Sequence, residues 1–144
     1  MMSTAYISVA LRKRVTKVAE HRCGYCLRTE ELMGMPMTIE HLIPQALGGL
    51  TTEDNLWLAC TSCNQFKGTQ IKARESQSRH WVKLFNPRLQ VWNEHFAWSA
   101  DGTQILGKTP CGRVTVIALQ MNNPEIIVTR RLWVSAGWWP PTLL

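Results

Sequence analysis

A chain of 144 residues, 45% of them hydrophobic and 18% charged, is large enough to bury one core, and we expect residues 1–144 to form a single domain. Sixteen Lys and Arg residues against ten Asp and Glu residues give a net charge of +6, which favours a polyanionic partner. No apolar run approaches the roughly 20 residues of a membrane helix, and the N-terminal sequence MMSTAY lacks the pattern of a secretory signal. We therefore expect no membrane association and a cytoplasmic location, where thiols stay reduced.

The first predicted element is an amphipathic helix from Ser8 to about Glu20. Leu11, Val15 and Val18 recur at helical spacing, and Ser8 is placed to cap the helix. The other faces carry the basic residues Arg12, Lys13, Arg14 and Lys17. For such a basic face taken by itself, a solvated surface is the favoured interpretation, and contact with phosphate is the alternative.

A tight turn and a first strand follow. The segment Cys23-Gly24-Tyr25-Cys26 predicts a turn with both thiols on one side, in which the glycine lets the backbone amides bend toward the sulfurs. A loop rich in Met and Gly covers Leu32 to Met37. Loose alternation and β-branched residues predict a strand over Met37 to Ile43 that ends at Pro44, and Gly48-Gly49 permits a turn.

The chain then returns to a second pair of cysteines. The apolar run Leu56 to Ala59 predicts a strand that pairs with the first or packs beside it. Thr61 or Ser62 is placed to cap a helix that begins near Cys63, and Gly68 is placed to end it.

A polar stretch beyond this helix carries four basic residues against the single acid Glu75. The basic residues are Lys72, Arg74, Arg79 and Lys83. We interpret the stretch as a linker or a helix.

The C-terminal part contains one predicted hairpin and two predicted helices. Apolar and aromatic residues between Glu94 and Gly107 flank Asp101-Gly102, which is typical of a β-hairpin. Thr109-Pro110 opens a helix to about Met121, and a further helix runs from Pro124 or Glu125 to Ala136.

Four of the five cysteines form two Cys-x-x-Cys pairs, which predict a tetrahedral zinc site. The predicted ligands are Cys23, Cys26, Cys60 and Cys63. The 33 residues between the pairs exceed the usual zinc-ribbon spacing of about 15 to 20. We therefore expect the segment between the two cysteine pairs to form additional structure. Four buried thiols without metal, or a redox-active pair, are less favoured interpretations. Cys111 lies outside the pattern and is interpreted as a free thiol.

The segment between the cysteine pairs, together with the residue that follows Cys63, carries side chains suited to phosphodiester hydrolysis. The imidazole of His41 has an ordinary pKa near neutrality and can take a proton from water. Glu40 and Asn64 supply hard oxygen atoms of the kind that Mg²⁺ or Mn²⁺ prefers. We therefore expect His41 to act as general base and a single divalent ion to bind Glu40 and Asn64.

The order of these motifs resembles the HNH endonuclease family in its HNN variant. The motifs are Ile-Glu-His-Leu-Ile-Pro, Gly-Gly, Asp-Asn-Leu and Cys-x-x-Cys-Asn-x-x-Lys-Gly, and the resemblance is strongest from Arg22 to Gly68. It implies an α+β fold with a ββα-metal, treble-clef-like core over residues 22–68, stapled by zinc. An N-terminal helix precedes this core, and a hairpin-plus-helices extension over residues 84–144 follows it.

The resemblance also implies roles for individual residues. His41 matches the general base, and Asn64 matches a ligand of the catalytic metal. Asn55 matches the asparagine that braces the loop between the strands and binds no metal. Family members commonly have aspartate where this chain has Glu40. Neighbouring residues on a regular strand point to opposite faces, so Glu40 and His41 address one phosphate only if the strand twists or ends there.

We therefore expect a metal-dependent DNA endonuclease that leaves 5′-phosphate and 3′-hydroxyl ends. Its expected phosphate contacts are Lys67, Arg12, Lys13, Lys17, Lys72 and Arg74. One alternative is a treble-clef zinc protein that binds nucleic acid without cutting it, and another is a zinc-stabilised protein-interaction module. Metal-dependent cleavage that His41→Ala abolishes would separate the endonuclease from both.

Overall fold

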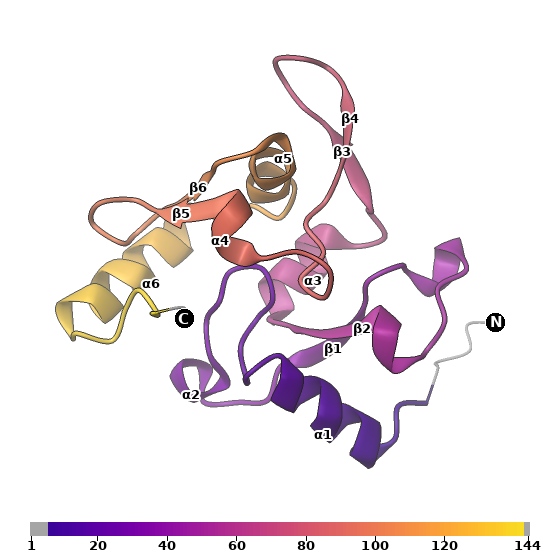
Figure 1. Ribbon diagram of the computed structural model, residues 1–144. Helices are drawn as coiled ribbons and strands as arrows, with labels where there is room; N and C mark the ends of the chain where they lie inside the picture. The colour runs from indigo at the N-terminus through magenta and orange to yellow at the C-terminus, as the bar shows by residue number, and fades with distance from the viewer. Residues whose placement is uncertain (1–5, 143–144) are drawn as a thin grey trace. The chain divides into compact units, whose positions relative to one another are not determined.

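The computed structural model of the protein describes residues 6–142, and Figure 1 shows its helices and strands. Residues 1–5 and 143–144 lie outside the described part, and with them most of the stretch on which the expectation about a secretory signal rests. The chain divides into two compact units, Met1–Ile71 and Lys72–Leu144. That residues 1–144 act as one domain stays a prediction. None of the helices described between residues 6 and 142 has the length and apolar character needed to span a bilayer.

The fold combines helices with small antiparallel sheets, which confirms the predicted α+β class. The first unit begins with α1 (Val9–Val18), whose first turn is capped by the Ser8 hydroxyl, 3.1 Å from the amide nitrogen of Leu11. Val15 is fully buried where α1 packs against the strands β1 and β2. This element agrees with the predicted helix.

The first cysteine turn leads into a short helix that the sequence does not reveal. The turn docks on the hairpin through the Gly24 amide, which donates to the Leu58 carbonyl over 2.9 Å. Leu27, which follows the turn, has a left-handed conformation with φ of 66°, whereas Gly24 is not among the described residues with positive φ. The helix α2 (Glu30–Met33) occupies the start of the predicted loop, and four residues are too few to produce a helical periodicity.

An antiparallel hairpin forms the centre of the first unit. Strand β1 (Thr38–His41) pairs with β2 (Leu56–Ala59), with Glu40 opposite Trp57 and His41 opposite Leu56. Both strands confirm the predicted segments, although β1 is shorter than predicted. The 3₁₀ turns η1 (Gln45–Leu47) and η2 (Glu53–Asn55) shape the connecting loop.

The second cysteine pair leads into α3 (Thr61–Lys67), which packs against β1 (Figure 1). The sequence predicts Thr61 or Ser62 as the helix cap, but the cap is Cys60. Its sulfur accepts a hydrogen bond from the Cys63 amide over 3.4 Å. A cysteine sulfur that faces the helix start takes the place of the usual hydroxyl. Gly68 ends the helix with φ of 53°, as predicted.

The second unit begins with a hairpin where the sequence predicts a linker or a helix. Strand β3 (Lys72–Arg74) pairs with β4 (Trp81–Lys83), and both strands contact α5. Three-residue strands show too little alternation to be recognised from the sequence. The connection between them contains Arg79 at φ of 62°. This left-handed conformation is uncommon for arginine, so the sequence does not predict a turn there.

The hairpin and the two helices predicted for the C-terminal part follow in the predicted order, preceded by a short helix, α4, that was not predicted. These elements are α4 (Trp92–His95), β5 (Phe96–Trp98), β6 (Ile105–Gly107), α5 (Pro110–Ala118) and α6 (Pro124–Ser135). Ring contacts join Phe85, Trp92, Phe96, Trp98, Trp133 and Trp139 into an aromatic core, with centroids 5.0 to 5.6 Å apart. Four of the seven tryptophans therefore serve packing in this core.

Candidate metal centre and active site

The four predicted zinc ligands come together in the first unit. Their sulfur atoms all lie within 4.8 Å of one another and all four residues are buried. The sulfurs of Cys26 and Cys60 are 3.7 Å apart. A tetrahedral zinc ion with Zn–S bonds of about 2.3 Å requires sulfurs about 3.8 Å apart, so this donor set fits zinc.

Hydrogen bonds to the sulfur atoms support the same interpretation. The amide of Tyr25 donates to Cys23 over 3.4 Å, and the guanidinium of Arg28 donates through Nε to Cys26 over 3.1 Å. Burial raises the pKa of the Cys23 thiol well above its ordinary value, and the neighbouring sulfurs do the same for Cys63, whereas hydrogen bonds from the other cysteines lower the pKa values of Cys26 and Cys60. Four thiols packed this closely ionise together only with a cation among them.

Asn55 ties together the two ends of the hairpin loop. Its side-chain oxygen accepts from the Ile43 amide over 2.8 Å, and its side-chain nitrogen donates to the Ile43 and Leu50 carbonyls over 3.0 and 2.9 Å. Gly49 lies inside this brace, where an added Cβ would stand 1.7 Å from the Ile43 oxygen. These contacts have the geometry that the family resemblance implies for Asn55.

His41 lies at the end of β1 with its ring only partly buried. Its Nε2 is 2.9 Å from the Thr51 hydroxyl, which comes from the braced loop. If Nε2 carries the proton and donates to Thr51, the lone pair of Nδ1 is available to accept a proton. Burial lowers the pKa of His41 below its ordinary value, which favours the neutral imidazole at physiological pH.

Glu40 lies in a different environment from its neighbour. Its carboxylate is buried and forms an ion pair with the Lys67 ammonium over 2.7 Å, with side-chain exposures of 2% and 4%. Lys67 also donates to the Leu42 carbonyl over 3.3 Å. Burial raises the pKa of Glu40, although Lys67 and the hydroxyl of Tyr25 oppose that shift.

The predicted catalytic side chains are therefore divided between the two faces of β1. Glu40 points toward α3 and His41 points toward the braced loop, as expected for neighbours on a regular strand. Asn64 is half buried on α3, one turn before Lys67. The Glu40 carboxylate, which we expected to be open to a divalent ion, is thus paired with the Lys67 ammonium.

Lys67 also departs from its predicted role in phosphate binding. Its ammonium is held inside the hairpin by Glu40 and Leu42, so it is not available on the surface. The reason is that α3 packs its last turn onto β1 and carries this side chain inward. The other expected phosphate contacts, Arg12, Lys13, Lys17, Lys72 and Arg74, are exposed.

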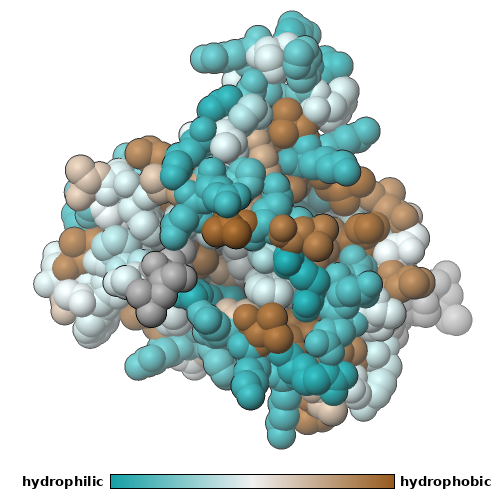
Figure 2. Space-filling model, viewed as in Figure 1, coloured by the Kyte–Doolittle hydropathy of each residue, from teal (hydrophilic) through white to brown (hydrophobic). Residues whose placement is uncertain are grey.

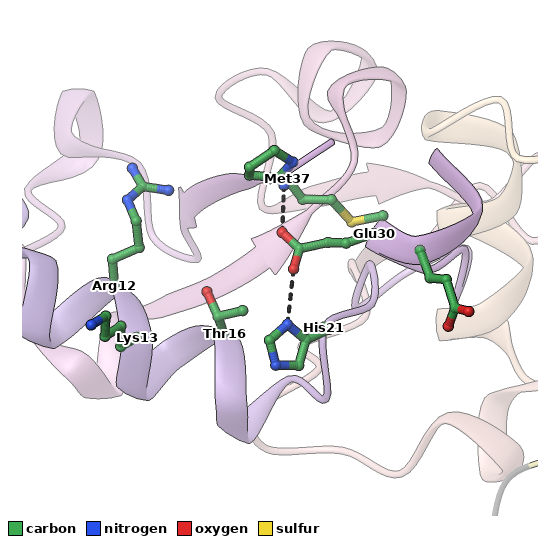
Figure 3. Close-up of a pocket in the computed structure, with 8 residues that line it drawn as sticks. Arg12, Lys13, Thr16, His21, Glu30 and Met37 are labelled. Atoms are coloured by element: carbon green, nitrogen blue, oxygen red, sulfur yellow. Dashed lines mark hydrogen bonds and ion pairs between the residues drawn. The ribbon is translucent and has the colours of Figure 1, made fainter. Parts of the chain in front are cut away.

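A cavity of about 500 Å³ lies elsewhere in the first unit, between α1 and α2. Figure 3 shows the Glu30 carboxylate between the His21 ring and Met37, with Arg12 and Lys13 extending from α1. Glu30 bonds to His21 Nδ1 over 3.0 Å and to the Met37 amide over 2.7 Å. Because this acid is already engaged on both oxygens, the cavity offers no hydrolytic centre.

Three contributors to the site were not identified from the sequence: Arg28, Thr51 and Tyr25. The signal for Arg28 was its position two residues after Cys26, where a cation can reach a ligand sulfur. Thr51 gave no signal, because its contact with His41 depends on how the loop folds back over ten residues.

A protein-family model described as HNH endonuclease matches residues 23–70. The matched segment contains the paired cysteines, the hairpin β1–β2 and α3. No curated protein and no solved structure matches the chain. The match confirms the family resemblance of this segment, which suggests a nuclease-type activity on nucleic acid, and the cysteine cluster suggests zinc binding.

Proposed function

We propose that the protein is a metal-dependent DNA endonuclease with His41 as its general base. The observation that carries the proposal is the position of His41 within the HNH segment: the Asn55-braced loop supplies Thr51, which orients the ring. A held imidazole beside an exposed loop is the arrangement that a hydrolytic base requires. The basic surface of α1 supplies attraction for the DNA backbone.

The proposed reaction is hydrolysis of one phosphodiester. Nδ1 of His41 takes a proton from water, the water oxygen forms a bond to phosphorus, and the bond from phosphorus to the 3′ oxygen breaks. The leaving oxygen is protonated by solvent, which gives 5′-phosphate and 3′-hydroxyl ends. Thr51 keeps the proton of His41 on Nε2 and so keeps Nδ1 basic.

Glu40 and Asn64 are the residues that would hold the divalent ion, because carboxylate and amide oxygens suit Mg²⁺ or Mn²⁺. When bound, the ion stabilises negative charge on the phosphate and on the leaving oxygen. Lys67 holds Oε1 of Glu40, so an ion binds at that oxygen only when the ammonium leaves.

Zinc is the proposed ion at the cysteine cluster, in a treble-clef-like ββα arrangement. It would join the first cysteine turn to the start of α3 and so fix the two ends of the segment that carries His41. Reduced thiols, which this site requires, agree with the cytoplasmic location expected from the sequence.

Nicking of supercoiled plasmid tests the proposal. The zinc-loaded protein should nick with Mg²⁺ or Mn²⁺, and His41→Ala should lower the rate about 10² to 10⁴-fold. His21→Ala is the matched control, because His21 is an exposed histidine whose ring is bonded to Glu30 and not to Thr51, and it should nick normally. Absence of nicking by the intact protein with either ion would refute the proposal.

One observation favours a second candidate, a zinc protein that binds nucleic acid without cutting it. The Glu40 carboxylate is already neutralised by Lys67, as a purely structural pair would be. This candidate predicts salt-dependent DNA binding that persists while nicking is absent under every divalent ion.

A further inference from the structure

We propose that the hairpin β3–β4 of the second unit binds single-stranded DNA, with Trp81 stacked on an unpaired base and Lys72, Arg74 and Lys83 around the adjoining phosphates. This inference rests on the proposed function, because it takes DNA as the partner of the protein. It adds that the substrate contains an unpaired strand.

The register of the hairpin places these four side chains on one face. Lys72 lies directly opposite Lys83, and Arg74 lies directly opposite Trp81. Residues two apart on a strand share a face, and so do residues directly across a strand pair. All four are exposed, whereas the alternate residues Ala73 and Val82 are half buried on the side where the strands contact α5.

Trp81 is the feature of this face that points to a base. Its side chain is 59% exposed, although tryptophan is usually packed. The Lys72 ammonium lies 5.3 Å and the Arg74 guanidinium 5.2 Å from its ring centroid. These cation–π contacts order the indole in the absence of any ligand, and an ordered exposed ring is a platform on which a base can stack.

The charges on this face lack an internal balance. Lysines directly opposite each other repel, and a hairpin of two short strands has little stability to spare. The nearest acid in sequence, Glu75, is engaged by Arg113 over 2.9 Å and by Ser78. Within residues 6–142 no ion pair joins Lys72, Arg74 or Lys83 to an acid. A phosphate between the opposed lysines would relieve their repulsion.

The space-filling view agrees with a polar ligand. Figure 2 shows mainly hydrophilic residues over β3–β4. A duplex keeps its bases stacked inside and offers no free face to Trp81, whereas a single strand offers both a base face and closely spaced phosphates. The combination of one exposed aromatic ring with three cations therefore fits a single strand better than a duplex.

Fluorescence anisotropy with labelled oligonucleotides tests the site, using the zinc-loaded full chain without added Mg²⁺ or Mn²⁺. We expect oligothymidine to bind more tightly than an abasic strand of equal length or a duplex. Trp81→Ala should weaken oligothymidine binding about tenfold and change abasic binding less than twofold, and Trp81→Phe should recover most of the loss. Lys83→Gln should lower the salt slope on single strands by about 0.7.

Trp138→Ala is the matched control, because Trp138 is also exposed, at 65%, but lies after α6. It should leave all three affinities unchanged. An unchanged oligothymidine affinity in Trp81→Ala would overturn the proposal, and so would an equal loss on the abasic strand. A dimer in sedimentation that Trp81→Ala dissolves would assign the face to a second copy of the chain instead.

The outcomes separate this inference from the proposed nuclease. Trp81-dependent strand binding without any nicking would leave the binding site standing and refute the endonuclease. Normal nicking with no effect of Trp81→Ala on strand binding would refute the binding site and leave the endonuclease standing.

Discussion

Removing the ammonium of Lys67 tests how much the buried ion pair with Glu40 contributes to the free energy of unfolding. Lys67→Met leaves a carboxylate that is 2% exposed without the cation 2.7 Å away. Loss of one partner of a buried pair costs about 3–5 kcal/mol, so we expect the free energy of unfolding to fall by about 4 kcal/mol. Glu40→Gln should cost about 2 kcal/mol, because the remaining ammonium still donates to the Leu42 carbonyl.

The double variant distinguishes a coupled pair from two independent side chains. Replacing both partners of a buried pair is often nearly neutral, so the combination of Glu40→Gln with Lys67→Met should cost about 1 kcal/mol or less. Independent side chains would instead give a sum of about 6 kcal/mol. Urea unfolding of the zinc-loaded variants, followed by tryptophan fluorescence, measures all three values. Lys17→Met is the control, since Lys17 is exposed on α1 and should change stability by less than about 0.5 kcal/mol.

The pH dependence provides an independent check on the same pair. Burial raises the folded-state pKa of Glu40 above its unfolded value, so its contribution to stability is present at low pH and is lost as the pH rises through the folded pKa. Lys67→Met removes an interaction that opposes this shift, and its destabilisation should therefore grow as the pH is raised from the ordinary glutamate pKa toward neutrality. A destabilisation that is additive with Glu40→Gln and constant over this range would refute the reasoning.

Three further predictions concern the brace, the zinc site and the base. Asn55→Ala removes three hydrogen bonds and should cost about 2–4 kcal/mol in urea unfolding and abolish nicking, while a zinc assay still finds one ion per chain. Arg28→Met removes the donor to Cys26 and should speed zinc transfer to a chelator by about tenfold, and an unchanged rate would exclude a role for that contact. Because burial lowers the pKa of His41, the nicking rate should rise with pH through a midpoint below the ordinary value of about 6.5, and a midpoint above it would contradict the assigned environment.

The sequence predicted those parts of the site that depend on local spacing. Two Cys-x-x-Cys pairs determine which sulfurs meet, because each pair is a single turn. The hairpin strands and α6 follow from runs long enough to show a period, and Asn123 caps α6 by an ordinary local hydrogen bond. The Asn55 brace came from the family resemblance, since no local rule connects an asparagine to an amide twelve residues away.

The remaining features depend on packing between segments that are distant in the sequence. The hairpin β3–β4 has strands of three residues, and its burial comes from α5, about thirty residues later. The pairing of Lys67 with Glu40 arises because α3 folds back onto β1. A lysine followed by glycine at a helix end is usually solvated, so its sequence position gives no sign of burial.

The buried pair of Glu40 and Lys67 also affects the affinity of this hairpin for a divalent ion. An ion that binds Oε1 of Glu40 must displace the Lys67 ammonium, and the affinity measured at that oxygen is the intrinsic affinity multiplied by the fraction of molecules in which the oxygen is available. If the pair is favoured by about 3 kcal/mol, the affinity for the ion is lowered by about 100-fold relative to an open carboxylate. Lys67→Met should then bind Mn²⁺ about 100-fold more tightly than the intact protein in calorimetry, whereas Glu40→Gln should bind it no better. Equal affinities in the intact protein and Lys67→Met would place the ion away from Oε1 of Glu40, the oxygen that Lys67 holds.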